Sequence, residues 1–199
     1  MTLSLLCSLL YPCAAVLIWK SSLRSRRPLR KAVLPAFFFA AFLLRIWLAL
    51  TQNGYPQDMS TFKAWAQLTH IHGLSGMYHA DFFLDYPPGY LYVLYFLEQL
   101  RLWFGLSSQD AVWNLILKLP SILADLLCAY LLYRVAQNRI RSVDAALLCG
   151  AYLFCPAILI NSSVWGQVDS FCLLFVFCAL LFLLQDVYKR QLDNSFFQT

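Results

Sequence analysis

The feature that most constrains this chain is a series of apolar runs, each near the length that a helix needs to cross a lipid bilayer. The five runs are residues 3–19, 33–51, 117–133, 143–160 and 171–185. About 20 residues of helix span the hydrocarbon layer, and the last run is the shortest. Hydrophobic residues make up 61% of the chain and charged residues 13%, a composition that would not stay soluble in water. The sequence predicts an all-α, multi-pass membrane protein with about five transmembrane helices.

The positions of Lys and Arg predict the orientation of these helices. Six cations crowd residues 20–31, and Arg134, Arg139 and Arg141 crowd a second connection. Cytoplasmic loops carry an excess of Lys and Arg, so both connections are expected in the cytoplasm and the N-terminus outside. The first run has no basic flank before it, which argues against a cleaved signal peptide. The net charge of +5 is assigned to topology and not to nucleic-acid binding.

One further apolar stretch, residues 90–104, is expected to lie on the outer surface of the membrane. If it crossed, the connection around Arg139 would move outside, against the charge bias. Glu98 and Arg101 interrupt the stretch and are expected to form a solvated pair, and its Tyr, Phe and Trp residues favour the headgroup level. Residues 52–116 then form one external loop with two surface helices, over 59–70 and 90–104.

The chain divides into three expected segments. Residues 1–32 hold the first span and the basic cytoplasmic connection, and residues 33–185 form the main helical module. Residues 186–191 read as the translation of a transposon end used to prepare sequencing libraries. Residues 186–199 are therefore interpreted as a sequencing-adaptor scar followed by an unrelated tail. The alternative is a genuine cytoplasmic tail. The parent protein is expected to be longer.

Polar motifs gather at the expected external ends of the spans. Asp58 follows the second apolar run, residues 85–90 read Asp-Tyr-Pro-Pro-Gly-Tyr, and residues 165–170 read Trp-Gly-Gln-Val-Asp-Ser. A carboxylate at the mouth of a membrane helix suits a base that acts on a lipid-borne substrate. The simpler alternative is that Asp58 caps the helix that follows, because Asp is a favoured N-cap residue.

Four motifs together resemble the N-terminal half of a GT-C membrane glycosyltransferase. They are residues 57–65, 85–90, 122–127 and 161–170. Their order is similar to that in asparagine-linked-glycosylation glucosyltransferases, protein O-mannosyltransferases and bacterial relatives, over roughly residues 33–185. The resemblance implies inverting transfer of a hexose from a polyprenyl-phosphate donor to a hydroxyl acceptor on a glycan, a lipid-linked glycan or a protein. The reaction would occur at the extracytoplasmic face of a bacterial-type plasma membrane, or of the endoplasmic reticulum if the source is eukaryotic.

The resemblance also implies that Asp58 is the catalytic base, which accepts the proton of the acceptor hydroxyl. A hydroxyl is a poor nucleophile until a positioned base takes this proton. Asp58, Phe62 and Trp65 are spaced i, i+4 and i+7, so Trp65 is expected in an aromatic floor beside the carboxylate. Lys118 is expected as an exposed ammonium that neutralises the donor phosphate, or alternatively as an anchor that snorkels to the interface.

The remaining candidate residues for substrate binding lie in the second and fourth of these motifs. Gly166 would let the backbone approach a ligand, and Gln167 and Asp169 offer hydrogen bonds to sugar hydroxyls. In the oligosaccharyltransferase branch an acidic pair holds a divalent metal in the equivalent loop. Because only Asp169 is present here, no metal or other cofactor is expected. The other candidates are Asp85, which could instead cap the following helix, Tyr86 and Trp165.

Two charges, Arg45 and Asp125, lie inside apolar runs and are expected to pair, since an unpaired charge at that depth is costly. Arg45 could alternatively reach toward the donor phosphate. The seven cysteines are expected to be packing residues, and the triplet beginning at Asn161 is expected to cap a helix or line a polar region and not to be glycosylated.

Two other classes of protein remain open. In a multispanning transporter or lipid flippase, Asp58, Arg45 and Asp125 would line a translocation path. Transporters tend to have helices broken at mid-membrane, whereas Pro and polar motifs are expected here at the external boundary. In a noncatalytic membrane subunit, Asp58 would be dispensable.

Overall fold

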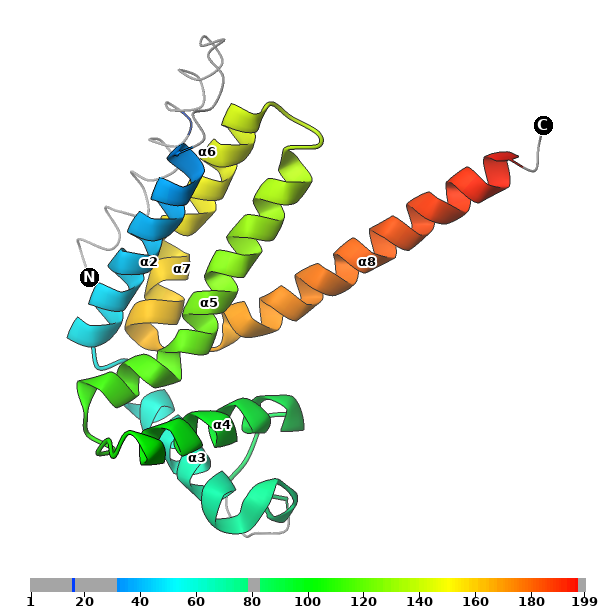
Figure 1. The fold of residues 1–199 in the computed structure, drawn as a ribbon. Helices are drawn as coiled ribbons and strands as arrows, with labels where there is room; N and C mark the ends of the chain where they lie inside the picture. The colour runs from blue at the N-terminus through cyan, green and yellow to red at the C-terminus, as the bar shows by residue number, and fades with distance from the viewer. Residues whose placement is uncertain (1–15, 17–31, 79–82, 197–199) are drawn as a thin grey trace.

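The computed structural model describes residue 16 and residues 32–78 and 83–196, and all regular structure within them is helical (Figure 1). Of the predicted first span only Val16 is described, and the basic connection over residues 20–31 lies outside the described residues. The elements in chain order are α2 (Val33–Thr51), α3 (Pro56–Gly76), α4 (Pro88–Trp103), α5 (Ala111–Ala136), α6 (Ser142–Leu153), α7 (Pro156–Leu159), the π-helix η1 (Ile160–Trp165) and α8 (Asp169–Phe196).

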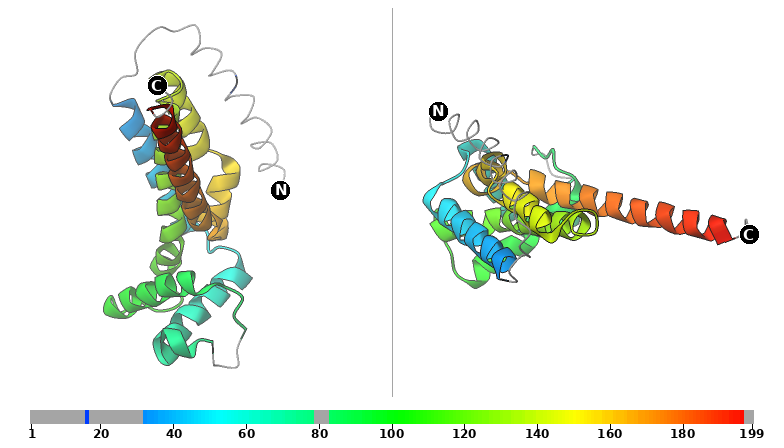
Figure 2. Two further views of the ribbon diagram at one scale, coloured as in Figure 1. Left: turned by 90° about the vertical axis from the view of Figure 1, so that its right-hand side faces the viewer. Right: turned by 90° about the horizontal axis from the view of Figure 1, so that it is seen from above.

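Helices α2, α5 and α6 pack side by side as a bundle, and α7 with η1 completes it (Figures 1 and 2). Small buried residues line the contacts: Ala41 on α2, Ala129 on α5 and Cys149 on α6. Small side chains let helix backbones approach closely, which is how apolar helices associate without a hydrophobic driving force. A β-carbon added to Gly150 would lie 2.8 Å from Cε2 of Phe37, so this glycine sets the α2–α6 approach.

Two described helices, α2 and α5, are long and apolar enough to cross a membrane, and a third span is counted if α6 and α7–η1 are taken as one bent unit. The apolar part of α8, Asp169–Leu184, is shorter. Helix α8 contacts α5 and then diverges from the bundle (Figures 1 and 2). An all-helical chain with membrane-length helices is thus found, whereas the count of five spans stays a prediction.

The predicted span over residues 143–160 is not one continuous helix. Helix α6 ends at Leu153, Cys155 is extended with ψ 121°, and the chain restarts as a helix at Pro156 with a bend of 43°. Proline lacks the backbone N–H and clashes with the preceding turn, so it begins a helix more readily than it continues one. The expectation that polar and Pro motifs interrupt the helices only at their external ends is wrong here.

The helices predicted over residues 59–70 and 90–104 are present as α3 and α4, which pack on one another across one end of the bundle (Figure 1). Their place on a membrane surface stays a prediction. The start of α2 and the connection from α5 to α6 lie at the opposite end. Helix α3 begins at Pro56 and bends at Gly73, where φ is 69°. Helices α3 and α4 and the start of α5 each contribute buried residues to one core, which includes Met59, Phe62, Trp65, Leu91, Leu94, Leu97 and Trp113.

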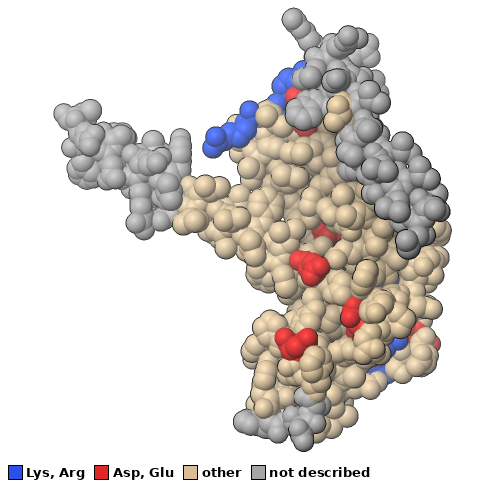
Figure 3. All heavy atoms as spheres, turned by 180° about the vertical axis from the view of Figure 1, so that it is seen from behind, with Lys and Arg blue, Asp and Glu red and all other residues tan. Residues whose placement is uncertain are grey.

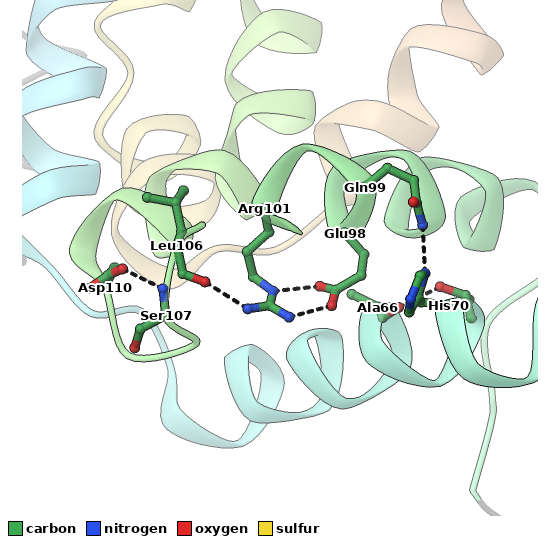
Figure 4. A network of polar contacts seen from close by, with 9 residues as sticks. Ala66, His70, Glu98, Gln99, Arg101, Leu106, Ser107 and Asp110 are labelled. Atoms are coloured by element: carbon green, nitrogen blue, oxygen red, sulfur yellow. Dashed lines mark hydrogen bonds and ion pairs between the residues drawn. The ribbon is translucent and has the colours of Figure 1, made fainter. Parts of the chain in front are cut away.

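Glu98 and Arg101 form the expected pair, but it is not solvated. Two bonds join the guanidinium to the Glu98 carboxylate, at 2.6 and 2.9 Å, and Glu98 is 1% exposed (Figure 4). The guanidinium also donates to the carbonyl of Leu106 at 2.7 Å and lies 5.7 Å from the ring centre of Trp113. The pair therefore ties α4 to the connection that leads into α5, which the i, i+3 spacing alone did not indicate.

The pairing of Arg45 with Asp125 is found as predicted. Nε of Arg45 lies 3.0 Å from Oδ2 of Asp125, and both side chains are fully buried. The same carboxylate oxygen accepts a 2.7 Å hydrogen bond from the hydroxyl of Ser162 in η1. A buried charge needs such partners because removal from water costs several kcal/mol per ion.

We expect Arg45→Met to destabilise the protein by about 3–5 kcal/mol, because the Asp125 carboxylate would stay buried without its counter-charge. Replacement of both residues, Arg45→Met with Asp125→Leu, should cost clearly less, since an apolar pair leaves no uncompensated charge. Unfolding of the purified protein in detergent micelles measures both changes. Equal costs for the single and the double variant would contradict the pairing energetics.

Candidate functional site

The centre of the candidate site is Asp58 in the first turn of α3. The helix begins at Pro56, and its N-cap residue is Tyr55, which makes no side-chain capping bond. Asp58 is therefore not the N-cap residue of this helix, and the alternative prediction of a capping role is wrong. Its half-buried carboxylate instead accepts hydrogen bonds at Oδ2 from the Trp165 indole, at 2.7 Å, and from the Gln167 side-chain amide.

The two oxygens of the Asp58 carboxylate differ in their surroundings. Both donors, Nε1 of Trp165 and Nε2 of Gln167, bind Oδ2. Among the described residues none donates to Oδ1. One oxygen thus orients the carboxylate while the other is available to accept a proton or to bind a hydroxyl, which is the arrangement that a general base requires.

The segment that holds Asp58 is shaped by the π-helix and by Gly166. Residues Ile160–Trp165 form the π-helix, and Gly166 then turns the chain with φ at 94°. The carbonyl of Asn161 accepts from the backbone N–H groups of Gly166 and Gln167, both at 3.0 Å. A left-handed residue of this kind closes a helix end and is normally glycine.

Gly166 also allows this turn to lie directly on α3. A β-carbon at residue 166 would lie 2.7 Å from Sδ of Met59. Beside it, the N–H of Tyr55 donates to the carbonyl of Trp165 at 2.9 Å, and the two rings lie 5.2 Å apart. The close approach expected at Gly166 is therefore made to the protein's own first turn of α3 and not to a ligand.

Trp65 does not form an exposed floor for a substrate. Its side chain is 3% exposed, and its indole N–H donates to the carbonyl of Phe83 at 2.9 Å. Tyr86 lies over it, with ring centres 5.2 Å apart, and also contacts Phe62 at 5.6 Å. A ligand beside Asp58 would meet Tyr86, and Trp65 acts as the packing residue beneath it.

Tyr86 lies in the negative field of the site. Burial, followed by the charges of Asp169 and Asp85, with smaller effects of Cys172 and Asp58, raises the pKa of Tyr86 to about 12. The phenol is therefore protonated at neutral pH and can donate a hydrogen bond to a ligand. Figure 3 shows acidic side chains around a hollow where the bundle meets the pair α3 and α4.

Asp85 and Asp169 lie exposed at the edge of this site. Asp85 does not cap α4, because the N-cap residue is Pro87. Asp169 begins α8 and accepts a 3.0 Å hydrogen bond from Nδ2 of Asn161. The structure thus brings Asp58, Trp165 and Gln167 into direct contact, while Asp85 and Asp169 reach the site through their charge and not through a contact with Asp58.

The expectation of an exposed Lys118 is wrong. The side chain is fully buried, and its ammonium donates to the carbonyls of Gln52 at 2.6 Å, Ser163 at 3.1 Å and Val164 at 3.4 Å. An ammonium has three donors, and all three are used. Carbonyls at helix ends lack partners within the helix and attract a cation. Lys118 therefore has no donor left for a phosphate in this arrangement.

Tyr55, which packs on Trp165, was not predicted from the sequence. Asn161 and Ser162 were expected to cap a helix or line a polar region, and here Asn161 closes the turn while Ser162 joins η1 to the buried charge pair. The Gly-Tyr-Pro sequence at residues 54–56 signals a turn, but it does not say which segment lies against it. Among the described residues no group of three or more His, Cys, Asp or Glu is arranged to hold a metal ion.

Comparison with known proteins gives no match, whether to a family model, to a curated protein or to a solved structure.

Three glycines allow the crowding at Gly166 to be separated from its backbone conformation. Gly166→Ala should cost clearly more than about 1–2 kcal/mol, because a left-handed residue and a clash with Met59 act together. Gly105→Ala, with φ at 64° and open space, should cost only the conformational part, and Gly89→Ala, with neither constraint, should be near neutral. Unfolding in detergent measures the three. Equal effects at residues 105 and 166 would contradict the close contact between the turn and α3.

Proposed function

We propose that this chain belongs to an inverting glycosyltransferase of the GT-C type, which moves a hexose from a polyprenyl phosphate to a hydroxyl acceptor at the extracytoplasmic face of a membrane. Two kinds of evidence support it, the sequence motifs and the hydrogen bonds made by the Asp58 carboxylate. The carboxylate of Asp58 is held on one oxygen by Trp165 and Gln167, while its other oxygen accepts no hydrogen bond from a described residue. Residues of two of the four motifs, distant in the sequence, meet at this carboxylate.

The chemistry proposed for Asp58 is general base catalysis. Oδ1 takes the proton of the acceptor hydroxyl as its oxygen bonds to the anomeric carbon, and the bond from that carbon to the phosphate oxygen breaks with its electron pair. Attack from the face opposite the phosphate inverts the anomeric configuration. Trp165 and Gln167 keep the carboxylate in place during this step, and Tyr86 can donate to the sugar or to the acceptor.

The second candidate, a transporter or lipid flippase, is favoured by one observation. The break between α6 and α7, with its bend of 43°, resembles the discontinuous helices of transporters. The buried charges argue against it, because Arg45 and Asp125 are fully buried and bonded to one another. Charges that line a translocation path would face a cavity or a water-filled channel.

The test of the proposed function is Asp58→Asn in the intact protein, assayed in membranes with a polyprenyl-phosphate hexose. The amide keeps an oxygen that can accept from Trp165 and Gln167, but it cannot take a proton at neutral pH. We expect sugar transfer to fall by about 10²- to 10⁴-fold while expression and donor binding persist. Asp110→Asn is the matched control, because Asp110 lies near the same end of the bundle and bonds only to its own turn.

Transfer at a near-normal rate in Asp58→Asn would overturn the assignment of the base. A noncatalytic subunit would show no transfer in either form, and the loss of Asp58 would leave its partners bound. A flippase would move labelled polyprenyl phosphate across vesicles without forming a glycosyl product. These three results separate the classes of protein.

The proposed topology places the two ends of α5 on opposite sides of the membrane. In a cysteine-free version of the protein, Gln109→Cys should react with an impermeant thiol reagent from outside, and Asn138→Cys should react only after permeabilisation. Both positions are exposed and flank the same helix, so each serves as the control for the other. Labelling of both from the same side would show that α5 does not cross.

A further inference from the structure

We propose that Lys118 is a positioning residue for Asp58, acting through the segment that carries Trp165 and Gln167; this role rests on the proposed function. Lys118 does not touch Asp58 in the structure. It binds backbone carbonyls on both sides of the contact that orients the carboxylate. Lys118 thus has a positioning role in place of the phosphate-binding role expected from the sequence.

The carbonyls that Lys118 binds come from two segments far apart in the chain. Gln52 directly follows α2 and leads into the turn before α3, which carries Asp58. Ser163 and Val164 lie in η1, directly before Trp165. One ammonium thus joins the segment before the carboxylate to the segment before its two hydrogen-bond donors.

A second contact from the same face of α5 also holds η1. Asp125 lies seven residues after Lys118, two helical turns along α5, so both side chains point the same way. Asp125 accepts from the hydroxyl of Ser162, and Arg45 holds Asp125 in turn. Helix η1 is therefore bonded to both a buried carboxylate and a buried ammonium of α5.

A lysine suits this position better than other residues. The carbonyl oxygens carry partial negative charges, and their convergence needs a cation between them. The three N–H bonds of an ammonium diverge tetrahedrally, as three separate acceptors require, whereas the planar fork of Arg matches paired oxygens such as a carboxylate. The Lys118 side chain also runs beside the Gly166 turn, because a β-carbon at Gly166 would lie 3.4 Å from Cε of Lys118, an ordinary contact distance.

The kinetic test compares Lys118→Met with wild type in the sugar-transfer assay. Without the ammonium the carbonyls separate, and Trp165 and Gln167 lose their fixed position over Asp58. We expect kcat to fall by about 10- to 100-fold with the donor KM little changed, as for a misplacement of about 1 Å at a reacting group. Arg134→Met, which removes an exposed cation from the far end of the same helix, should keep the wild-type kcat.

Two further variants link the effect to the proposed route. In a Trp165→Phe background, which lacks the indole donor, Lys118→Met should lower kcat by a smaller factor than in wild type, because coupled residues are not additive. Lys118→Arg keeps the charge but not the three-carbonyl geometry, and it should give an intermediate kcat. If Lys118→Met fails to accumulate as folded protein, the Arg variant carries the kinetic test.

A geometric measurement tests the inference without any sugar transfer. In a cysteine-free protein that carries Asp58→Cys and Gln167→Cys, a short bifunctional thiol reagent should link the two positions efficiently when Lys118 is present. Lys118→Met should lower the crosslinking rate severalfold, and Arg134→Met should not. This result depends only on the position of the two segments, so it distinguishes failure of the positioning role from failure of the proposed function.

Each outcome decides the inference. Wild-type kcat in both Lys118 variants, with unchanged crosslinking, would overturn it, even where Asp58→Asn abolishes transfer. If Lys118→Met instead raises the donor KM and leaves kcat unchanged, the positioning role is also overturned, and Lys118 would have a role in substrate binding. Reduced crosslinking on loss of Lys118, together with no sugar transfer by the wild-type protein, would support the positioning role and refute the enzyme proposal.

Discussion

The polar face of α5 is the feature on which this arrangement of helices depends. Lys118 and Asp125 are fully buried inside a bundle of apolar helices, where a polar group without a partner would cost several kcal/mol. Each finds its partners outside α5: Lys118 in the carbonyls that follow α2 and in η1, and Asp125 in Arg45 and Ser162. The need to satisfy these two side chains therefore holds α2, α5 and η1 in one relative position.

The same requirement also fixes the position of α3, because the segments that Lys118 binds lead directly into it and into its contact with Trp165. The segment after α2 runs into α3 at Pro56, and η1 ends at Trp165 beside it. Gly54 and Gly166 allow the two segments to touch, since a β-carbon at either position would lie within 3 Å of Met59. The contact between Asp58, Trp165 and Gln167 forms where these segments meet. Polar satisfaction inside the bundle thus sets the geometry of a carboxylate at its end.

The sequence predicted those features of the fold and the site that depend on residues close together in the chain, or on charges that must find a partner. Hydropathy located α2 and α4, because apolar length and aromatic content are properties of one segment. The pairing of Arg45 with Asp125 was also predictable, since a charge in an apolar run must find a partner and few candidates exist. The break at Pro156 had a local signal, but its effect was underestimated within a continuous apolar run.

The role of Lys118 could not be predicted in the same way, because its partners are backbone carbonyls. Every residue has a carbonyl, so no sequence pattern marks the ones that a tertiary fold leaves without a partner. Trp65 and Gly166 were misread for a related reason. Spacing showed which residues share a face of α3, but not that Tyr86 covers that face, and the glycine showed a close approach without showing to what.

The charge balance of the site limits how an anionic donor can bind there. Asp58, Asp85 and Asp169 all act on Tyr86 through their charge, so three carboxylates share this end of the bundle. Of the described cations nearby, Lys118 has all three donors bound to carbonyls, and the guanidinium of Arg101 is held by Glu98. A donor phosphate would therefore be repelled by the site unless another positive charge enters with it.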